Sequence, residues 1–233
     1  MKGYLILAGL LLPLLLQAQQ HKVKSITAYY DTTAVVELFN QAPIGLEITY
    51  TNGEIRATEG FMHGNYRWKY IKVTSPDGTV RNGVLTFDRS YLPQNQYQVK
   101  LLVTLPDVEQ PIATTLQLPY LTGIRFHHYA DSLKKDIRFY LNVEGRFSTG
   151  KIYPLDTSVI QFAASAGRLL GQDLLLSRPD TSRFINVTAT YKLNPSMVIH
   201  TVIPVKQKQD DDSMIIKDER DLFNNNRRKK RGG

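Results

Sequence analysis

The residues of this chain that could do chemistry are few, and the strongest candidate for a metal site is a histidine pair. His127 and His128 are adjacent, and Asp131 follows three residues later. Histidine is the commonest protein metal ligand, but neighbouring residues of a strand point to opposite faces, so both rings cannot easily share one ion. Further ligands would have to come from distant positions such as His63 or His200. We therefore predict no metal site, no cofactor and no catalytic residue.

The densest aromatic stretch is a candidate for binding a glycan. Alternation along a strand would place Tyr66, Trp68 and Tyr70 on one side, and Arg67 and Lys69 on the other. An exposed row of aromatic rings could stack on sugar rings, whereas an inward row would form a core with Trp68 at its centre. We favour the core interpretation and keep a glycan contact through the three aromatic residues as the alternative.

The end of the chain is a candidate for contacting a partner through charge. An acidic block at residues 210–212 precedes a basic run that consists of Arg227, Arg228, Lys229, Lys230 and Arg231. Segregated charge blocks are typical of solvated, disordered segments, so we predict a disordered charged tail over residues 206–233. The alternative is attachment to an anionic envelope surface or to an acidic protein.

The beginning of the chain predicts export, which argues against nucleic acid as the partner of that tail. Lys2 precedes an apolar stretch over residues 4–16, and Ala18 offers a small residue at a cleavage site. This is the pattern of a secretory signal peptide, here residues 1–18. An uncleaved anchor is the alternative, although a membrane-spanning helix needs about 20 apolar residues. The sequence predicts no transmembrane span in the mature chain.

The absence of cysteine narrows the expected location and chemistry. With no cysteine in 233 residues, the chain has no disulfide, no thiolate ligand and no lipidated cysteine after the signal. An exported chain of this kind must rely on its hydrophobic core for stability. We expect a periplasmic or extracellular protein, from a Gram-negative bacterium.

Sequence motifs give no support to an enzyme. The chain has no Gly-x-Ser-x-Gly elbow, no phosphate-binding glycine loop and no His-Glu-x-x-His. A hydrolytic enzyme, the least favoured alternative, would need a concave cluster built from His127, His128, Asp131 and distant carboxylates.

The elements that must position all these residues are strands. Apolar and polar residues alternate with a period of two through much of the region 23–205, which predicts half-buried strands. The clearest runs are Asp136–Glu144, Tyr97–Leu105 and Phe184–Tyr191. Turn signals separate the runs, including Asn52-Gly53, which is typical of a type I′ hairpin. The sequence therefore predicts an all-β fold.

A loose internal repeat predicts how the strands are divided. Glycines, strands and prolines recur at an offset of about 90 residues, so that Gly78–Gly83 corresponds to Gly167–Gly171, each pair bracketing a short hairpin strand. An immunoglobulin-like sandwich has about 100 residues. We predict two tandem immunoglobulin-like β-sandwiches, over residues 22–119 and 121–205, joined near Pro119–Leu121. One larger β-domain is the main alternative.

The pattern over residues 22–205 resembles the immunoglobulin-like exported proteins of Gram-negative bacteria, and this resemblance transfers no site residues. It implies a non-catalytic envelope protein that binds another envelope protein through strand edges, loops and the charged tail. A glycan-binding or adhesive module is the second hypothesis, and a hydrolytic enzyme is the third.

Overall fold

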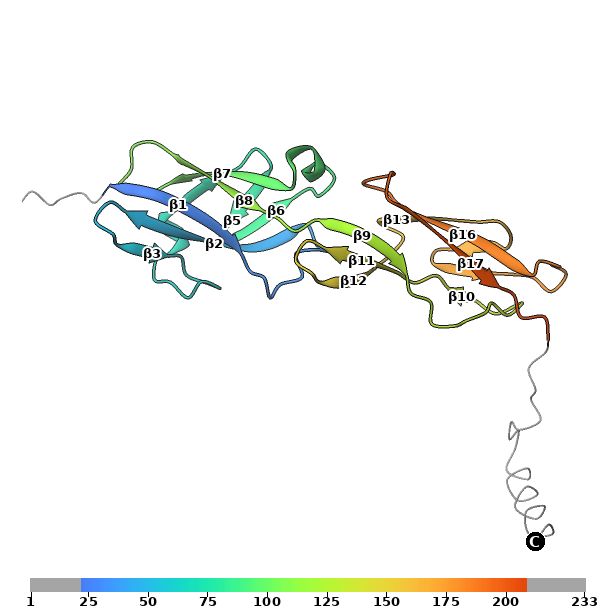
Figure 1. The fold of residues 1–233 in the computed structure, drawn as a ribbon. Coiled ribbons are helices and arrows are strands. Elements are labelled where there is room, and N and C mark those ends of the chain that lie inside the picture. Colours follow the sequence, from blue (N-terminus) through green and yellow to red (C-terminus); the bar gives the residue numbers. More distant parts are fainter. Residues whose placement is uncertain (1–21, 209–233) are drawn as a thin grey trace, which may run out of the picture. The chain divides into compact units, whose positions relative to one another are not determined.

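The computed structural model describes residues 22–208. These residues form strands and two short 3-10 turns, and no α-helix occurs among them (Figure 1). The all-β prediction is therefore confirmed. The predicted signal peptide and all but the first residues of the predicted tail lie outside the described residues. Within residues 22–208, no helix is long and apolar enough to cross a membrane.

The chain divides into two compact units between Tyr120 and Leu121. This position falls inside the predicted junction at Pro119–Leu121. That each unit is a separate immunoglobulin-like domain stays a prediction.

The first unit contains eight strands in two sheets. They are β1 (Val23–Tyr30), β2 (Gln41–Tyr50), β3 (Ile55–Ala57), β4 (Lys72–Thr74), β5 (Gly78–Arg81), β6 (Val84–Phe87), β7 (Gln98–Thr104) and β8 (Ile112–Gln117). One sheet has the order β1-β2-β6-β5, with β3 also paired to β2, and the other has the order β4-β7-β8. The 3-10 turns η1 (Trp68–Tyr70) and η2 (Leu92–Asn95) lie in the connections.

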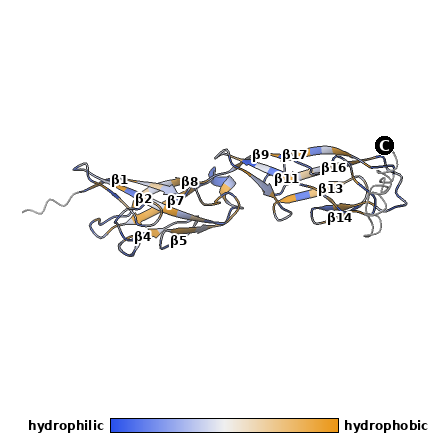
Figure 2. Ribbon diagram, turned by 90° about the horizontal axis from the view of Figure 1, so that it is seen from below, coloured by the Kyte–Doolittle hydropathy of each residue, from blue (hydrophilic) through white to orange (hydrophobic). Residues whose placement is uncertain are grey.

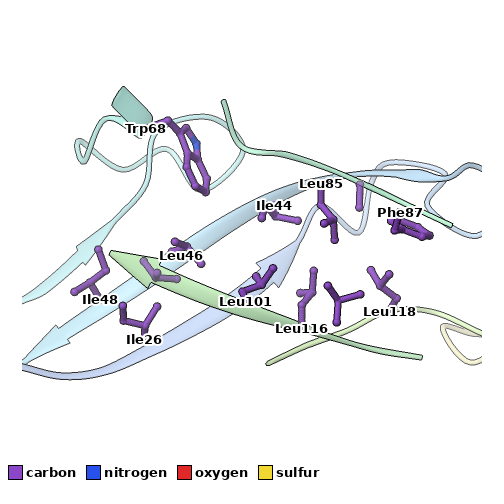
Figure 3. Close-up of a cluster of buried hydrophobic side chains, with 14 of the residues drawn as sticks. Ile26, Ile44, Leu46, Ile48, Trp68, Leu85, Phe87, Leu101, Leu116 and Leu118 are labelled. Carbon is purple, nitrogen blue, oxygen red and sulfur yellow. The ribbon is translucent and has the colours of Figure 1, made fainter. Parts of the chain in front are cut away.

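The core of the first unit follows from the period-two pattern. On β7, Val99, Leu101 and Val103 are fully buried, while the residues between them are at least partly exposed. They pack in one cluster with Ile44, Leu46 and other apolar residues of β2 (Figure 3). Burial of each such side chain stabilises the folded state by about 1.5–3 kcal/mol. The apolar side of each strand therefore faces the core.

Two hairpins of the first unit differ in turn type. The predicted hairpin at Asn52-Gly53 is confirmed, since β2 pairs with β3, but only Gly53 has a positive φ. The Gly53 amide donates to Tyr50 O and the Tyr50 amide donates to Glu54 O. This is a three-residue loop with a glycine bulge, so the type I′ prediction was wrong here. Asn82 and Gly83, between β5 and β6, both have positive φ, as a type I′ turn requires.

The second unit contains nine strands in three small sheets. The strands are β9 (Leu121–Phe126), β10 (Phe139–Tyr140), β11 (Val143–Phe147), β12 (Ile152–Leu155), β13 (Ile160–Ala164), β14 (Arg168–Leu170), β15 (Asp173–Leu175), β16 (Phe184–Tyr191) and β17 (Val198–Pro204). The sheet orders are β12-β11-β9, β10-β15-β14 and β13-β16-β17. Figure 2 shows apolar and polar residues mixed along single strands such as β13 and β17, as half-buried strands require.

The predicted strands of the second unit are only partly correct. The run Phe184–Tyr191 is confirmed as β16. The run Asp136–Glu144 is not one strand, because β10 pairs with β15 whereas β11 pairs with β9 and β12. Asp136 has a positive φ, Ile137 is exposed and Asn142 is buried, which breaks the predicted alternation at both ends. The chain changes sheets within this run, and a period-two pattern cannot reveal such a change.

Candidate interaction surface

The aromatic stretch of the first unit does not form an exposed row. Residues 68–70 form the 3-10 turn η1 instead of the predicted strand. Trp68 is buried in the core, Tyr66 packs against the core and Tyr70 is exposed. The Trp68 ring nitrogen donates to Glu59 O at 3.2 Å, and the Trp68 amide donates to Glu59 Oε1 at 3.0 Å. These positions support the core interpretation that we favoured.

An edge of Trp68 still borders a shallow hollow of about 390 Å³, which Phe61, Lys69 and Val84 also line. Tyr66 and Tyr70 do not line this hollow. The predicted glycan contact through Tyr66, Trp68 and Tyr70 stays a prediction.

The two adjacent histidines point in different directions. The exposed His127 places Nδ1 at 2.7 Å from Glu144 Oε1. The ring of His128 packs against Phe126 and Phe139, with centroid separations of 5.0 and 5.4 Å, and its buried nitrogens have no hydrogen-bond partner in the described part of the chain. Burial, and next the charge of His127, lowers the pKa of His128.

His127, His128 and Asp131 therefore do not form one set of metal ligands. Across residues 22–208, no group of three or more His, Cys, Asp or Glu side chains lies close enough together to hold a metal ion. The basic run at residues 227–231 lies outside the described residues, so its predicted partner contact stays a prediction.

The most distinctive surface of the described chain is one face of the sheet β13-β16-β17. Its outward side chains carry no charge, although 21% of all residues in the chain are charged. We call it the uncharged face, and it consists of Gln161, Ala163, Phe184, Asn186, Thr188, Thr190, Val198, His200, Val202 and Pro204. Charged residues are depleted at the centres of protein interfaces, so this composition is typical of a binding surface.

The uncharged face combines side chains from three strands, which the cross-strand register places side by side. Thr190 of β16 lies between Gln161 and Val198, and Thr188 lies between Ala163 and His200. The side chains of Thr188 and His200 are joined by a hydrogen bond of 3.0 Å between Oγ1 and Nδ1. Phe184 is 61% exposed and Val202 is 58% exposed. Large apolar side chains therefore remain in water on this face of the sheet.

The backbone of β17 is open along the edge of the same sheet. The Tyr191 amide donates to Met197 O at 3.0 Å, and the Val205 amide donates to Arg183 O at 2.8 Å. Bonded and non-bonded pairs alternate along an antiparallel ladder. By that alternation Ile199, Thr201 and Ile203 bond to β16, whereas the N–H and C=O groups of Val198, His200 and Val202 point away from it.

One residue already closes the far end of this edge. The Leu133 amide donates to Pro204 O and the Lys206 amide donates to Leu133 O, both at 2.8 Å, forming a single parallel bridge. Strand β9 passes near β17 but pairs with β11. From Val198 to Val202, the outward backbone groups have no strand partner within residues 22–208. We call this segment the open edge.

Sequence reasoning missed the uncharged face and the open edge. The only available signal was the run of uncharged polar and aromatic residues at Phe184, Asn186, Thr188 and Thr190. The sequence does not reveal that β13 and β17 flank this strand.

The described residues thus define an all-β protein of sandwich class that carries an uncharged, open-edged sheet. No family model and no curated protein matches this chain. The solved structures with a coarse likeness to it include two from the bacterial S-layer protein SbsC.

The N-terminal part of SbsC has 12% identity and a TM-score of 0.31, and the match covers 79% of this chain and 44% of that chain. Domains 4 and 5 of SbsC have 14% identity and a TM-score of 0.29, with 79% of this chain and 98% of that chain covered. This chain therefore spans less than half the length of the first of these structures. TM-scores this low assign no function.

Proposed function

We propose that this chain is an exported, non-catalytic protein that binds a partner protein of the bacterial envelope through the open edge of β17. The partner contributes an extended segment that pairs with Val198, His200 and Val202. Strand addition of this kind takes its affinity from main-chain hydrogen bonds and its specificity from the flanking side chains. The single observation that carries the proposal is the open edge beside an uncharged face.

The composition of this edge supports binding over simple exposure. Natural proteins protect free sheet edges with lysine, proline, bulges or covering loops. Between Val198 and Val202 the edge has none of these residues, and only its far end is covered, by Leu133. A partner strand of about five residues, or roughly 17 Å, would satisfy the free groups. Phe184 and Val202 would bury their exposed surface against the residues that flank that strand.

The first test places a photo-crosslinking amino acid at Val202 in the native host. The control position is Leu102, an exposed aliphatic residue of the first unit. We expect a crosslinked partner from position 202 and none from position 102. Hydrogen exchange of the purified complex should then show protection of the His200 and Val202 amides, which crosslinking alone cannot show.

A proline variant tests the backbone contact. His200→Pro removes an N–H that points outward, so the ladder to β16 stays intact. We expect loss of the crosslink at position 202 with unchanged folding of the second unit. Retention of the same partner by His200→Pro, or equal capture from positions 102 and 202, contradicts the proposal.

The charged tail is a second proposed contact, through Arg227, Arg228, Lys229, Lys230 and Arg231. A tethered second contact raises the effective concentration of the first. Deletion of residues 209–233 should therefore weaken capture at position 202 without abolishing it. Unchanged partner retention after this deletion removes the tail from the proposal.

A further inference from the structure

A second surface of the second unit lies on the sheet β12-β11-β9 and, unlike the uncharged face, carries charged side chains. At its centre Glu144 accepts hydrogen bonds from Arg125 Nε at 2.9 Å and Arg125 Nη2 at 2.7 Å. The other carboxylate oxygen lies 2.7 Å from His127 Nδ1. The side chain of Glu144 is only 17% exposed, and the hydrogen bonds from His127 and Arg125 lower its pKa. These three polar groups are therefore held in fixed positions.

Two exposed tyrosines continue from this group. The ring of Tyr129 lies 6.1 Å from the His127 ring and 6.2 Å from the Tyr140 ring, with an angle of 22° between the tyrosine planes. Tyr129 is 75% exposed and Tyr140 is 42% exposed. The Tyr140 hydroxyl donates to Gln172 Oε1 at 3.1 Å, and Gln172 Nε2 donates to Leu155 O at 3.1 Å. Tyr140 is thus anchored at its hydroxyl while much of the residue stays exposed.

A hollow lies at the other end of the same surface. It has a volume of about 420 Å³, and its walls include Gly123, Arg125, Glu144, Arg146 and Ile152. A Cβ atom on Gly123 would meet no atom within 4 Å, so the glycine leaves space at the cross-strand position opposite Arg146. Arg146 is exposed and forms no ion pair with any residue in the range 22–208.

We propose that this surface binds an acidic saccharide. A sugar carboxylate in the hollow pairs with the Arg146 guanidinium, whose planar fork matches a carboxylate. A sugar further along the same oligosaccharide lies over the rings of Tyr129 and Tyr140, which present flat apolar faces. Arg125, Glu144 and His127 supply hydrogen-bonding atoms for the hydroxyl groups between these two positions.

The same features favour a saccharide over a protein ligand. The volume of the hollow falls within the range of small-ligand sites, and Arg125 and Glu144 in its wall already hold each other in place, so these two groups need little ordering on binding. Two arginines and one glutamate line the hollow, which leaves a local excess of positive charge. That excess favours binding of sugars that carry carboxylates over binding of neutral sugars.

The test uses the full chain and two defined probes, a hexamer of galacturonic acid and a hexamer of glucose, titrated calorimetrically up to millimolar concentration. We expect the acidic hexamer to bind and the neutral hexamer to bind at least about tenfold more weakly, as loss of a charge-assisted contact implies. Failure of the acidic hexamer to bind overturns the proposal.

Matched variants separate the site from general attraction to a basic protein. Arg146→Gln should weaken binding of the acidic hexamer by about tenfold, and Tyr129→Ala should weaken binding of both hexamers. Arg81→Gln and Tyr91→Ala make the same changes at exposed residues of the first unit and should leave binding unchanged. Equal weakening by Arg81→Gln and Arg146→Gln overturns the proposal, because binding would then follow net charge alone.

Discussion

The Thr58 hydroxyl oxygen accepts a hydrogen bond from the Leu46 amide at 3.0 Å in the interior of the first unit. The Thr58 amide in turn donates to Leu46 O at 3.0 Å. Thr58 is fully buried, so its side chain completes the backbone pairing of β2 where β3 has ended.

Replacement of Thr58 by valine tests this contact, because valine has the same shape and no oxygen. A buried amide without an acceptor costs about 1–3 kcal/mol, and we expect a loss of this size in the stability of the first unit. Trp68 is the only tryptophan of the chain, so its fluorescence during urea unfolding measures this unit. Thr58→Ser keeps the oxygen and should cost less; a valine variant as stable as the wild type would contradict the role of the bond.

Gly83 and Gly53 form a matched pair for testing the packing of Trp68. Both glycines have positive φ, so alanine strains the backbone at either position by about 1–2 kcal/mol. A Cβ on Gly83 would also lie 2.5 Å from Trp68 Nε1, whereas a Cβ on Gly53 would meet nothing. We expect Gly83→Ala to destabilise the first unit by about 1–3 kcal/mol more than Gly53→Ala. Equal losses in urea unfolding would show that Trp68 adapts without cost.

Arg89 ties together two segments that are far apart in the sequence, residues 36–39 and Pro119. Its guanidinium donates to Phe39 O at 2.9 Å, to Pro119 O at 3.3 Å and to Val36 O. Lysine cannot reproduce this planar fork, so Arg89→Lys should cost about 2–3 kcal/mol, the strength of charge-assisted bonds. The control is Arg81→Lys at an exposed site, for which we expect no change in the unfolding midpoint. Similar midpoints for both variants would show that Arg89 is not needed for stability.

We expect the partly buried His128 to make the second unit sensitive to acid. Because its pKa is lowered in the folded chain, the unfolded chain binds a proton at this residue more readily than the folded chain. The stability that the neutral His128 confers is complete above the ordinary histidine pKa of about 6.5. It is lost as the pH falls through the lower pKa of the folded chain. His128→Phe removes both the titrating group and the unpartnered nitrogens. We expect the stability of the second unit to vary less with pH and to increase by about 1 kcal/mol at neutral pH.

Hydrogen exchange of the Ile185 and Val187 amides measures this effect, because both residues are buried in β16. Trp68 fluorescence provides the internal control, since the first unit should respond to pH equally in wild type and variant. An unchanged pH profile of the two amides in His128→Phe would assign the acid sensitivity to other groups.

The sequence alone determined the local character of the chain. Period-two alternation identified β7 and β16 with their buried residues, because one face of a half-buried strand must be apolar. The Asn52-Gly53 pair identified the hairpin there, because glycine tolerates the positive φ that such turns need. Alternation also indicated all-β structure, and the internal repeat indicated a junction near Pro119–Leu121, where the two units divide.

Only the tertiary structure decided which faces meet and which stay in water. Alternation separates the two sides of a strand, but it does not say which strand lies beside it or in what register. For that reason Trp68 turned out to be buried in a 3-10 turn, the run Asp136–Glu144 was divided between two sheets, and His127 and His128 acquired opposite environments. The uncharged face and the surface that carries Arg146 and Tyr129 each combine residues from separate strands and loops. Only strand pairing in the folded chain brings these residues together.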